Sequence, residues 1–187
     1  MRIGNVWVGL TVSMLFVLGG VLPRANAGED AWEAHRFLEG EWTGEGSGKP
    51  GEGKGRFSFA FELQGKVLVR RNHSEYPASA GRPAITHDDL MVVYRGDGGK
   101  QIKAIYFDSE DHVIHYTATV SEDKRTITYV SDKVTAAPRY RLSYTKGKDQ
   151  KVSIKFEIAP PGKPDAFKTY LEGSADRKDR PKINANK

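Results

Sequence analysis

The chain has 187 residues, a formal net charge of +5 at pH 7 and no cysteine. Without cysteine the protein cannot form disulfides, use a thiol nucleophile or bind zinc through thiolates. The basic residues are scattered along the chain rather than clustered, which argues against a nucleic-acid-binding groove. The length suits a single domain with a sizeable core.

Residues 1–27 have the three parts of a secretory signal peptide. Arg2 supplies the positive start, an apolar run covers residues 6–22, and Ala25-Asn26-Ala27 forms an A-x-A cleavage site. The alternative is a permanent membrane anchor, but the apolar run is at the short end of the roughly 17–25 residues that span a bilayer. We therefore expect cleavage after Ala27, export to the periplasm or the extracellular space, and no permanent membrane span afterwards.

One short helix is expected over Gly28–Leu38. Asp30 can act as its N-cap, Glu33 three residues later can complete a capping box, and Gly40 ends the helix.

The segment from residue 44 to residue 55 is rich in glycine. Its Gly46-x-Gly48-x-x-Gly51 pattern formally matches a dinucleotide-binding fingerprint. That fingerprint needs a strand before it and a helix after it, whereas here Pro50 interrupts and a strand-like segment follows. We expect a flexible loop and no nucleotide cofactor.

From residue 56 onward, apolar and polar residues alternate with a period of two, as in strands with one buried face. Phe57, Phe59, Phe61 and Leu63 give the first such face. After a first strand near Trp42, the expected strands end at residues 63, 76, 95, 107, 120, 131, 145, 158 and 171. Short turns join most of them, which favours an all-β, up-and-down antiparallel barrel of about ten strands over residues 28–175, with a polar tail at 176–187.

Two motifs resemble those of the calycin superfamily, which includes lipocalins, fatty-acid-binding proteins and nitrobindin-like proteins. Gly40-x-Trp42 after a short helix resembles its first-strand signature, and the longer pattern from Leu38 to Gly46 is similar to the nitrobindin-like and domain-of-unknown-function branches. Residues 106–116 resemble the central hairpin of exported, uncharacterised members. The resemblance covers Trp32 to about Gly173 and implies a barrel around a cavity, usually for a hydrophobic ligand, with Gly40 and Trp42 in structural roles.

The resemblance does not extend to a cofactor. Nitrobindin-like members bind haem through a histidine in a late strand, but this chain has no histidine after His115, so neither haem nor another cofactor is expected. Lipocalins tend to place an arginine over the tryptophan, and Arg177 could occupy that position.

Arg70 and Arg71 are the most informative charged pair, because consecutive strand residues face opposite sides. A two-residue turn at Gln64-Gly65 puts Arg70 inside the barrel together with Asn72, whereas a three-residue turn puts Arg71 inside. We favour the first. An inward arginine in an apolar cavity needs an anion, which could be a ligand carboxylate or an acidic residue of the protein; otherwise it lies at the open rim.

Tyrosines recur along the expected strands, and each offers an apolar wall with a polar tip. The candidate ligand-binding residues are therefore Arg70, Asn72, Tyr106, Tyr116 and Tyr140.

No catalytic or metal site is expected. His112 and His115 are three residues apart and would face opposite sides of a strand, which makes them poor joint metal ligands. His73 and the group at residues 87–89 are isolated.

Three functions are compatible with such a barrel: a binding module for a small apolar or amphipathic molecule, an enzyme using His115 or His73 with a carboxylate, and a filled barrel that binds a partner protein. The first requires an apolar cavity with a few polar groups. The second requires a histidine and a carboxylate within hydrogen-bond reach inside it. The third predicts no cavity. The first is favoured, with ligand identity and oligomeric state left open.

Overall fold

A computed structural model describes residues 30–178 of the chain. The expected signal peptide, residues 1–27, and all but the first residues of the expected tail lie outside that range. No helix between residues 30 and 178 is both long enough and apolar enough to cross a membrane.

Ten antiparallel strands close into a barrel in the order β1-β10-β9-β8-β7-β6-β5-β4-β3-β2. Each strand pairs with its neighbour in sequence and β1 pairs with β10, which confirms the all-β, up-and-down barrel. The strands are β1 (Gly40–Gly48), β2 (Gly53–Glu62), β3 (Val67–Tyr76), β4 (Ile85–Gly96), β5 (Gln101–Asp108), β6 (Val113–Val120), β7 (Thr126–Ser131), β8 (Arg139–Lys146), β9 (Lys151–Ala159) and β10 (Lys168–Arg177).

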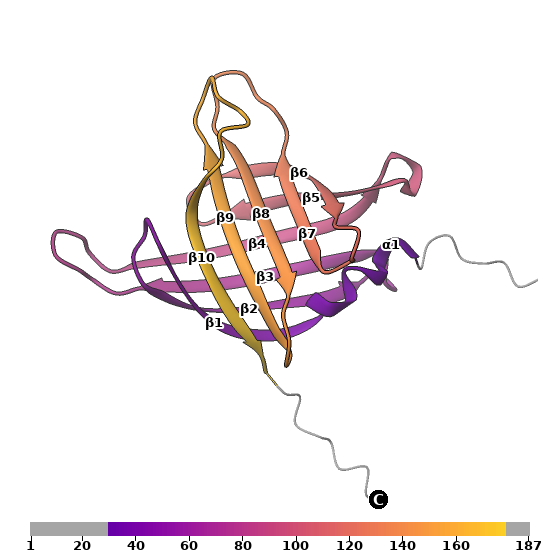
Figure 1. The fold of residues 1–187 in the computed structure, drawn as a ribbon, viewed down its shortest axis with the longest axis horizontal. Helices are drawn as coiled ribbons and strands as arrows, with labels where there is room; N and C mark the ends of the chain where they lie inside the picture. The colour runs from indigo at the N-terminus through magenta and orange to yellow at the C-terminus, as the bar shows by residue number, and fades with distance from the viewer. Residues whose placement is uncertain (1–29, 179–187) are drawn as a thin grey trace, which may run out of the picture.

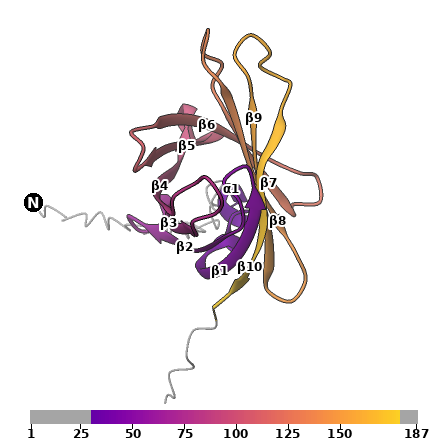
Figure 2. The same ribbon diagram turned by 90° about the vertical axis from the view of Figure 1, so that its left-hand side faces the viewer.

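The strands form two walls that cross at a steep angle. In Figure 1, β8, β9 and β10 run steeply across the front of the molecule, and β1 to β4 pass behind them. Figure 2 shows β1 to β6 curling round to meet the taller wall formed by β7 to β10. The start of β1 and the end of β10 lie at one end of the barrel, called here the floor; the opposite end is called the mouth.

The helix expected over Gly28–Leu38 is not supported as one element. The structure instead has a single α-helical turn, α1 (Asp30–Glu33), and a separate 3-10 turn, η1 (Arg36–Leu38). Nearby aromatic packing explains the break, because the His35 ring between the two turns is fully buried against Trp32 and Tyr129.

The glycine-rich segment is mostly strand, so the expectation of a flexible loop over residues 44–55 was wrong. β1 continues to Gly48 and β2 starts at Gly53. The glycines allow the barrel to close: a Cβ atom on Gly44 would lie 2.4 Å from the Ser174 carbonyl oxygen, and one on Gly173 would lie 2.4 Å from the Glu45 carbonyl oxygen. Small residues are needed because β1 and β10 approach closely there.

The last strand also differs from expectation. It runs from Lys168 to Arg177, whereas the expected strand ended at Leu171. The small residues after Leu171 do not end the strand, because they pair with β1. This pairing continues to Arg177, which lies opposite Trp42.

The hairpin between β2 and β3 has the expected register. The last pair is Glu62 with Val67, so Leu63 to Lys66 form the connection. Leu63 and Gln64 have positive φ angles of 49° and 57°. Leu63 is 70% exposed and does not share the inward face of Phe57, Phe59 and Phe61 as expected, because the strand has already ended.

The floor half of the barrel is filled by side chains. The fully buried residues of this core include Leu38, Phe59, Leu68, Met91, Val93, Ile127, Tyr129, Tyr144 and Val152. His35 plugs the same end; burial lowers its pKa to about 4, so the ring is neutral at pH 7. Its two ring nitrogens have no hydrogen-bond partner among residues 30–178.

Candidate functional site

A cavity of about 420 Å³ occupies the mouth half of the barrel. Pockets of this size are suited to small-molecule ligands. The apolar and aromatic side chains that line it include Phe57, Ile114, Tyr116, Tyr140, Leu142, Ile154, Phe156 and Leu171. A cavity is therefore present, whereas the filled-barrel alternative predicted none.

One side of the cavity is polar because of the pairing between β3 and β4. Inward residues of β3 change from Leu68 at the floor to Arg70 and Asn72 toward the mouth, and Asn72 lies opposite Asp89 on β4. His87 follows two residues away on the same face of β4 and also lines the cavity. Together with Tyr106 of β5, the four residues Arg70, Asn72, His87 and Asp89 form what we call the polar corner.

A buried ion pair between Arg70 and Asp89 is the centre of the polar corner. Nη1 of Arg70 donates to Oδ1 of Asp89, and the two side chains are only 9% and 3% exposed. Burial alone would lower the Arg70 pKa, but Asp89 and the oxygens of nearby tyrosines offset it, so the pKa lies above its usual value. The guanidinium also lies 5.8 Å from the centre of the Phe57 ring.

Asp89 is the hub of the remaining hydrogen bonds. Nδ2 of Asn72 donates to its Oδ2 over 2.9 Å, and Nε2 of His87 lies 3.4 Å from the same oxygen. Nε2 of His87 is also 3.0 Å from the Tyr106 hydroxyl, and its Nδ1 is 3.2 Å from a carboxylate oxygen of Glu110. The hydrogen bond to Asp89 is the largest cause of a raised His87 pKa.

The phenols in the cavity are held neutral. Burial is the largest cause of a raised pKa at Tyr106 and at Tyr116, and Asp89 adds to it at both positions. Arg70 acts in the opposite direction but does not reverse the shift. The interior therefore disfavours a new negative charge even beside a guanidinium.

The five candidate ligand-binding residues all line this cavity: Arg70, Asn72, Tyr106, Tyr116 and Tyr140. Their role in binding stays a prediction. The expected orientation of the arginine pair is confirmed, since Arg70 is buried whereas the Arg71 side chain is 60% exposed and pairs with Glu62 at 3.0 Å. The anion beside Arg70 is a residue of the protein, which was one of the alternatives.

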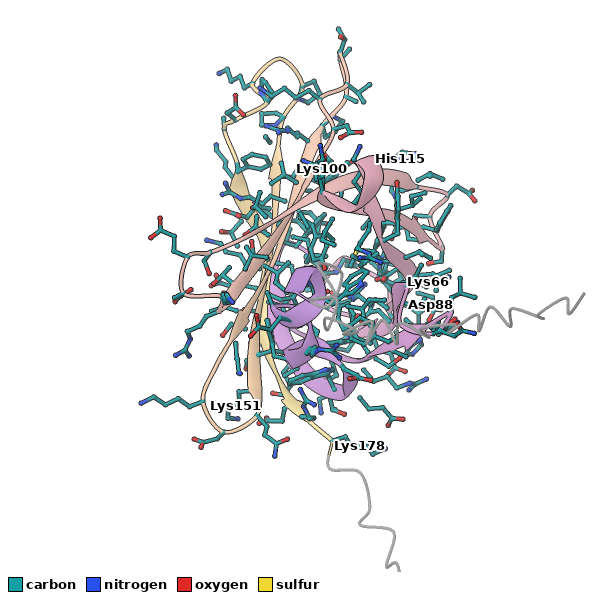
Figure 3. The ribbon with its side chains drawn as sticks, turned by 90° about the vertical axis from the view of Figure 1, so that its right-hand side faces the viewer. Lys66, Asp88, Lys100, His115, Lys151 and Lys178 are labelled. Atoms are coloured by element: carbon teal, nitrogen blue, oxygen red, sulfur yellow. The ribbon has the colours of Figure 1, made fainter. Side chains whose placement is uncertain are left out.

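His87 and Asp89 were not predicted as site residues, because in the sequence they lie outside any recognised motif. The signal that could have found them was their spacing of two, which puts both on one face of a strand. The histidines considered for catalysis do not reach the cavity. His115 is exposed on the outer side of β6, and Figure 3 shows it together with Asp88 at the periphery of the molecule. His73 contacts Asp88 and Glu75 on the outer side of β3.

Residues 30–178 contain no group of three or more histidine, aspartate or glutamate side chains arranged to hold a metal ion. His112 instead contacts Asp108, with 3.0 Å between Nδ1 and Oδ2, and that carboxylate also accepts backbone hydrogen bonds in the turn after β5. The chemistry that the polar corner offers is hydrogen bonding, together with proton exchange at His87.

The floor of the barrel is closed by Trp42. Its indole nitrogen donates to the Leu38 carbonyl over 2.8 Å, and its ring stacks on Phe57 with 6.0 Å between centroids. Arg177 covers the other side, with its guanidinium carbon 4.7 Å from the ring centre and Nη2 donating to the Phe37 carbonyl over 2.5 Å. The expected placement of an arginine over the tryptophan is confirmed. Gly40 has a φ of 124° where the chain enters β1, which explains why a glycine is needed there.

Comparison with solved structures found a similar barrel fold with a TM-score above 0.5. The crystal structure of Rv2717c from M. tuberculosis superposes with a TM-score of 0.55 and 17% sequence identity, covering 80% of this chain and 98% of that chain. A de novo designed fluorescence-activating β-barrel gives a TM-score of 0.37 and 12% identity over 78% of this chain and 97% of that one. No family model and no curated protein matches the sequence. At these identities the likeness to Rv2717c concerns the barrel fold alone.

Proposed function

We propose that the protein is an exported, calycin-like binding module that holds a small apolar or amphipathic molecule inside the mouth half of its barrel. The observation that carries this proposal is the 420 Å³ cavity. Its walls carry many aromatic and aliphatic side chains, and its polar groups include the polar corner, a combination that is typical of a ligand pocket.

Two further features support the calycin-like and exported parts of the proposal. The stacking of Arg177 on Trp42, directly after the Gly40-x-Trp42 motif, matches what the resemblance implies for the closed end of the barrel. The apolar run and the A-x-A site within residues 1–27 support export.

A cavity-filling variant tests the proposal. Ile154 lines the cavity, while Ser153 beside it is exposed on the outer face. Ile154→Trp should abolish binding of an environment-sensitive naphthalene fluorophore because the larger side chain occupies the ligand space, whereas Ser153→Trp should bind like the wild type. Thermal melts of both variants would establish that they are folded. Equal fluorophore binding by Ile154→Trp and the wild type would contradict a site inside the barrel.

Acid–base catalysis is a second candidate, favoured by one observation. His87 lies in the cavity with Nε2 3.4 Å from Asp89 and 3.0 Å from the Tyr106 hydroxyl, which meets the requirement for a histidine and a carboxylate in reach of each other. Turnover of a cavity-bound compound by the wild type but not by His87→Gln would support it. Binding of the same compound without change, in both proteins, would favour the binding module.

A further inference from the structure

The outer face of β3 to β6 carries a contiguous apolar patch. Strand pairing aligns its side chains in two adjacent rows that cross the strands. These residues point outward because they alternate with inward residues such as Met91 and Tyr106. What we call the outer patch consists of Val69, Val92 and Ile105 in one row and Leu90, Phe107 and Val113 in the next.

The outer patch is separate from the barrel core. Neither the buried core cluster of residues 30–178 nor the partly buried side chains packed against it include any of its six residues. Phe107 is 41% exposed and Val113 is 58% exposed. The outward side chains of β9 are instead Ser153, Lys155 and Glu157, as expected for a sheet face in water. A contiguous apolar area on an outer face typically marks an interaction site.

The two ends of the outer patch carry opposite charge. The charged residues at its mouth end are His73, Glu75, Asp88, Glu110, Asp111 and His112. Those at its floor end are Lys66, Arg95, Asp97, Lys100 and Lys103. With neutral histidines, the mouth end is acidic and the floor end is basic. Figure 3 shows Lys66 and Asp88, from the two ends, on the same side of the molecule and away from Lys151.

The other charges near the outer patch do not change this polarity. Arg71 and Glu62 lie beside it and pair with each other at 3.0 Å. Asp108 lines the cavity, and its side chain is only 5% exposed. The Asp88 side chain is 63% exposed, although it also contacts His73.

We propose that the outer patch binds the same patch of a second copy of this chain, giving a symmetric dimer in which the strands of the two copies run in opposite directions. A two-fold axis in the plane of the interface, running across the strands, places the acidic end of each patch over the basic end of the other. Because the interface is symmetric, this charge match occurs twice. The inference is independent of what the cavity binds.

The charges favour this arrangement over its alternatives. A dimer with the two mouth ends together would set acid against acid, which is unfavourable across an interface. A membrane surface fits less well, because the acidic end would face anionic headgroups. Face-to-face packing of the two sheets also removes the six apolar side chains from water.

Sedimentation velocity over a concentration series tests the proposal. The wild type should sediment with twice the chain mass and dissociate on dilution. Phe107→Glu should weaken self-association by about a hundredfold, because it places a charge inside the apolar contact. Ser153→Glu, at an exposed outward position of β9, is the matched control and should remain dimeric. Far-UV circular dichroism should show that both variants keep the strand content of the wild type.

Charge reversal tests the relative orientation of the two copies. Asp88→Lys and Lys66→Glu should each weaken self-association by about tenfold, because each places like charges together. A mixture of these two variants should associate like the wild type, because every contact between acidic and basic ends then joins opposite charges.

Three outcomes would overturn the proposal. A monomer at every concentration would exclude the dimer, even if that monomer bound lipid vesicles or another protein. A dimer that persists in Phe107→Glu would place the interface elsewhere. A mixture of the two charge variants that associates no better than either variant alone would refute the arrangement with opposed strands.

Discussion

Removing Arg70 should destabilise the barrel far more than removing Arg71. In Arg70→Met, the new side chain keeps much of the apolar stem but leaves Asp89 as an unpaired charge that is 3% exposed. Breaking a buried ion pair from one side costs about 3–5 kcal/mol. Asn72 and His87 still contact the carboxylate, so we expect a loss near the lower figure, about 3 kcal/mol in the free energy of unfolding.

A loss of this size is readily measured. For a domain of this length it corresponds to a fall of roughly 6–12 °C in Tm, or a clear shift of the urea midpoint with little change in slope. Arg71→Met is the matched control, because it removes an exposed pair with Glu62 that is worth about 0–1 kcal/mol.

The double variant Arg70→Met/Asp89→Asn should recover most of the loss, because it removes the stranded charge and not only its partner. Equal destabilisation by Arg70→Met and Arg71→Met would refute the reasoning. So would a double variant that is less stable than Arg70→Met, since the ion pair would then not explain the effect.

Three other predictions concern the floor of the barrel, pH dependence and processing. Trp42→Ala should lower the free energy of unfolding by about 3–5 kcal/mol in urea titrations, because it leaves a cavity in a packed site that is 2% exposed; an unchanged midpoint would contradict its role as a plug. The His35 pKa of about 4 lies below the ordinary 6.5, so the unfolded chain binds the proton more tightly, and the His35 contribution to stability should fall as pH drops from about 6.5 to about 4. His35→Phe should flatten the Tm–pH curve over that range relative to the wild type, whereas His115→Phe, on the outer face, should leave the curve unchanged. Parallel curves for His35→Phe and the wild type would show that His35 does not cause this pH dependence. N-terminal sequencing of the exported protein should begin at Gly28, and a mature chain that retains residues 6–22 would instead be membrane-tethered.

The barrel and the orientation of Arg70 could be predicted from the sequence because both depend on local patterns. Alternation with a period of two fixes which residues share a face, and the turn at Gln64-Gly65 fixes the register of β3 against β2. The connection is longer than a two-residue turn, yet Glu62 still pairs with Val67, so Arg70 faces inward as predicted.

The partner of Arg70 could not be predicted in the same way. Asp89 comes to Arg70 through the pairing of β3 with β4, and the connection between these strands, residues 77–84, has no turn signal that fixes their register. His87 was not predicted for the same reason, because it also lies on β4 and reaches the site through this pairing. The glycines of β1 were misread for another reason: glycine usually marks loops, whereas Gly44 is needed for the close approach of β10, a contact between the two ends of the chain.

Native mass spectrometry of the protein purified from its own host tests the central claim most directly. We predict a non-covalent small-molecule adduct on the wild type that persists in Ser153→Trp and is absent from Ile154→Trp, because Ile154 alone of these two positions lines the cavity. An adduct that persists in Ile154→Trp would place the ligand outside the barrel. A bare polypeptide mass for all three proteins, from a preparation that keeps other non-covalent complexes intact, would contradict the claim that the barrel holds a small molecule.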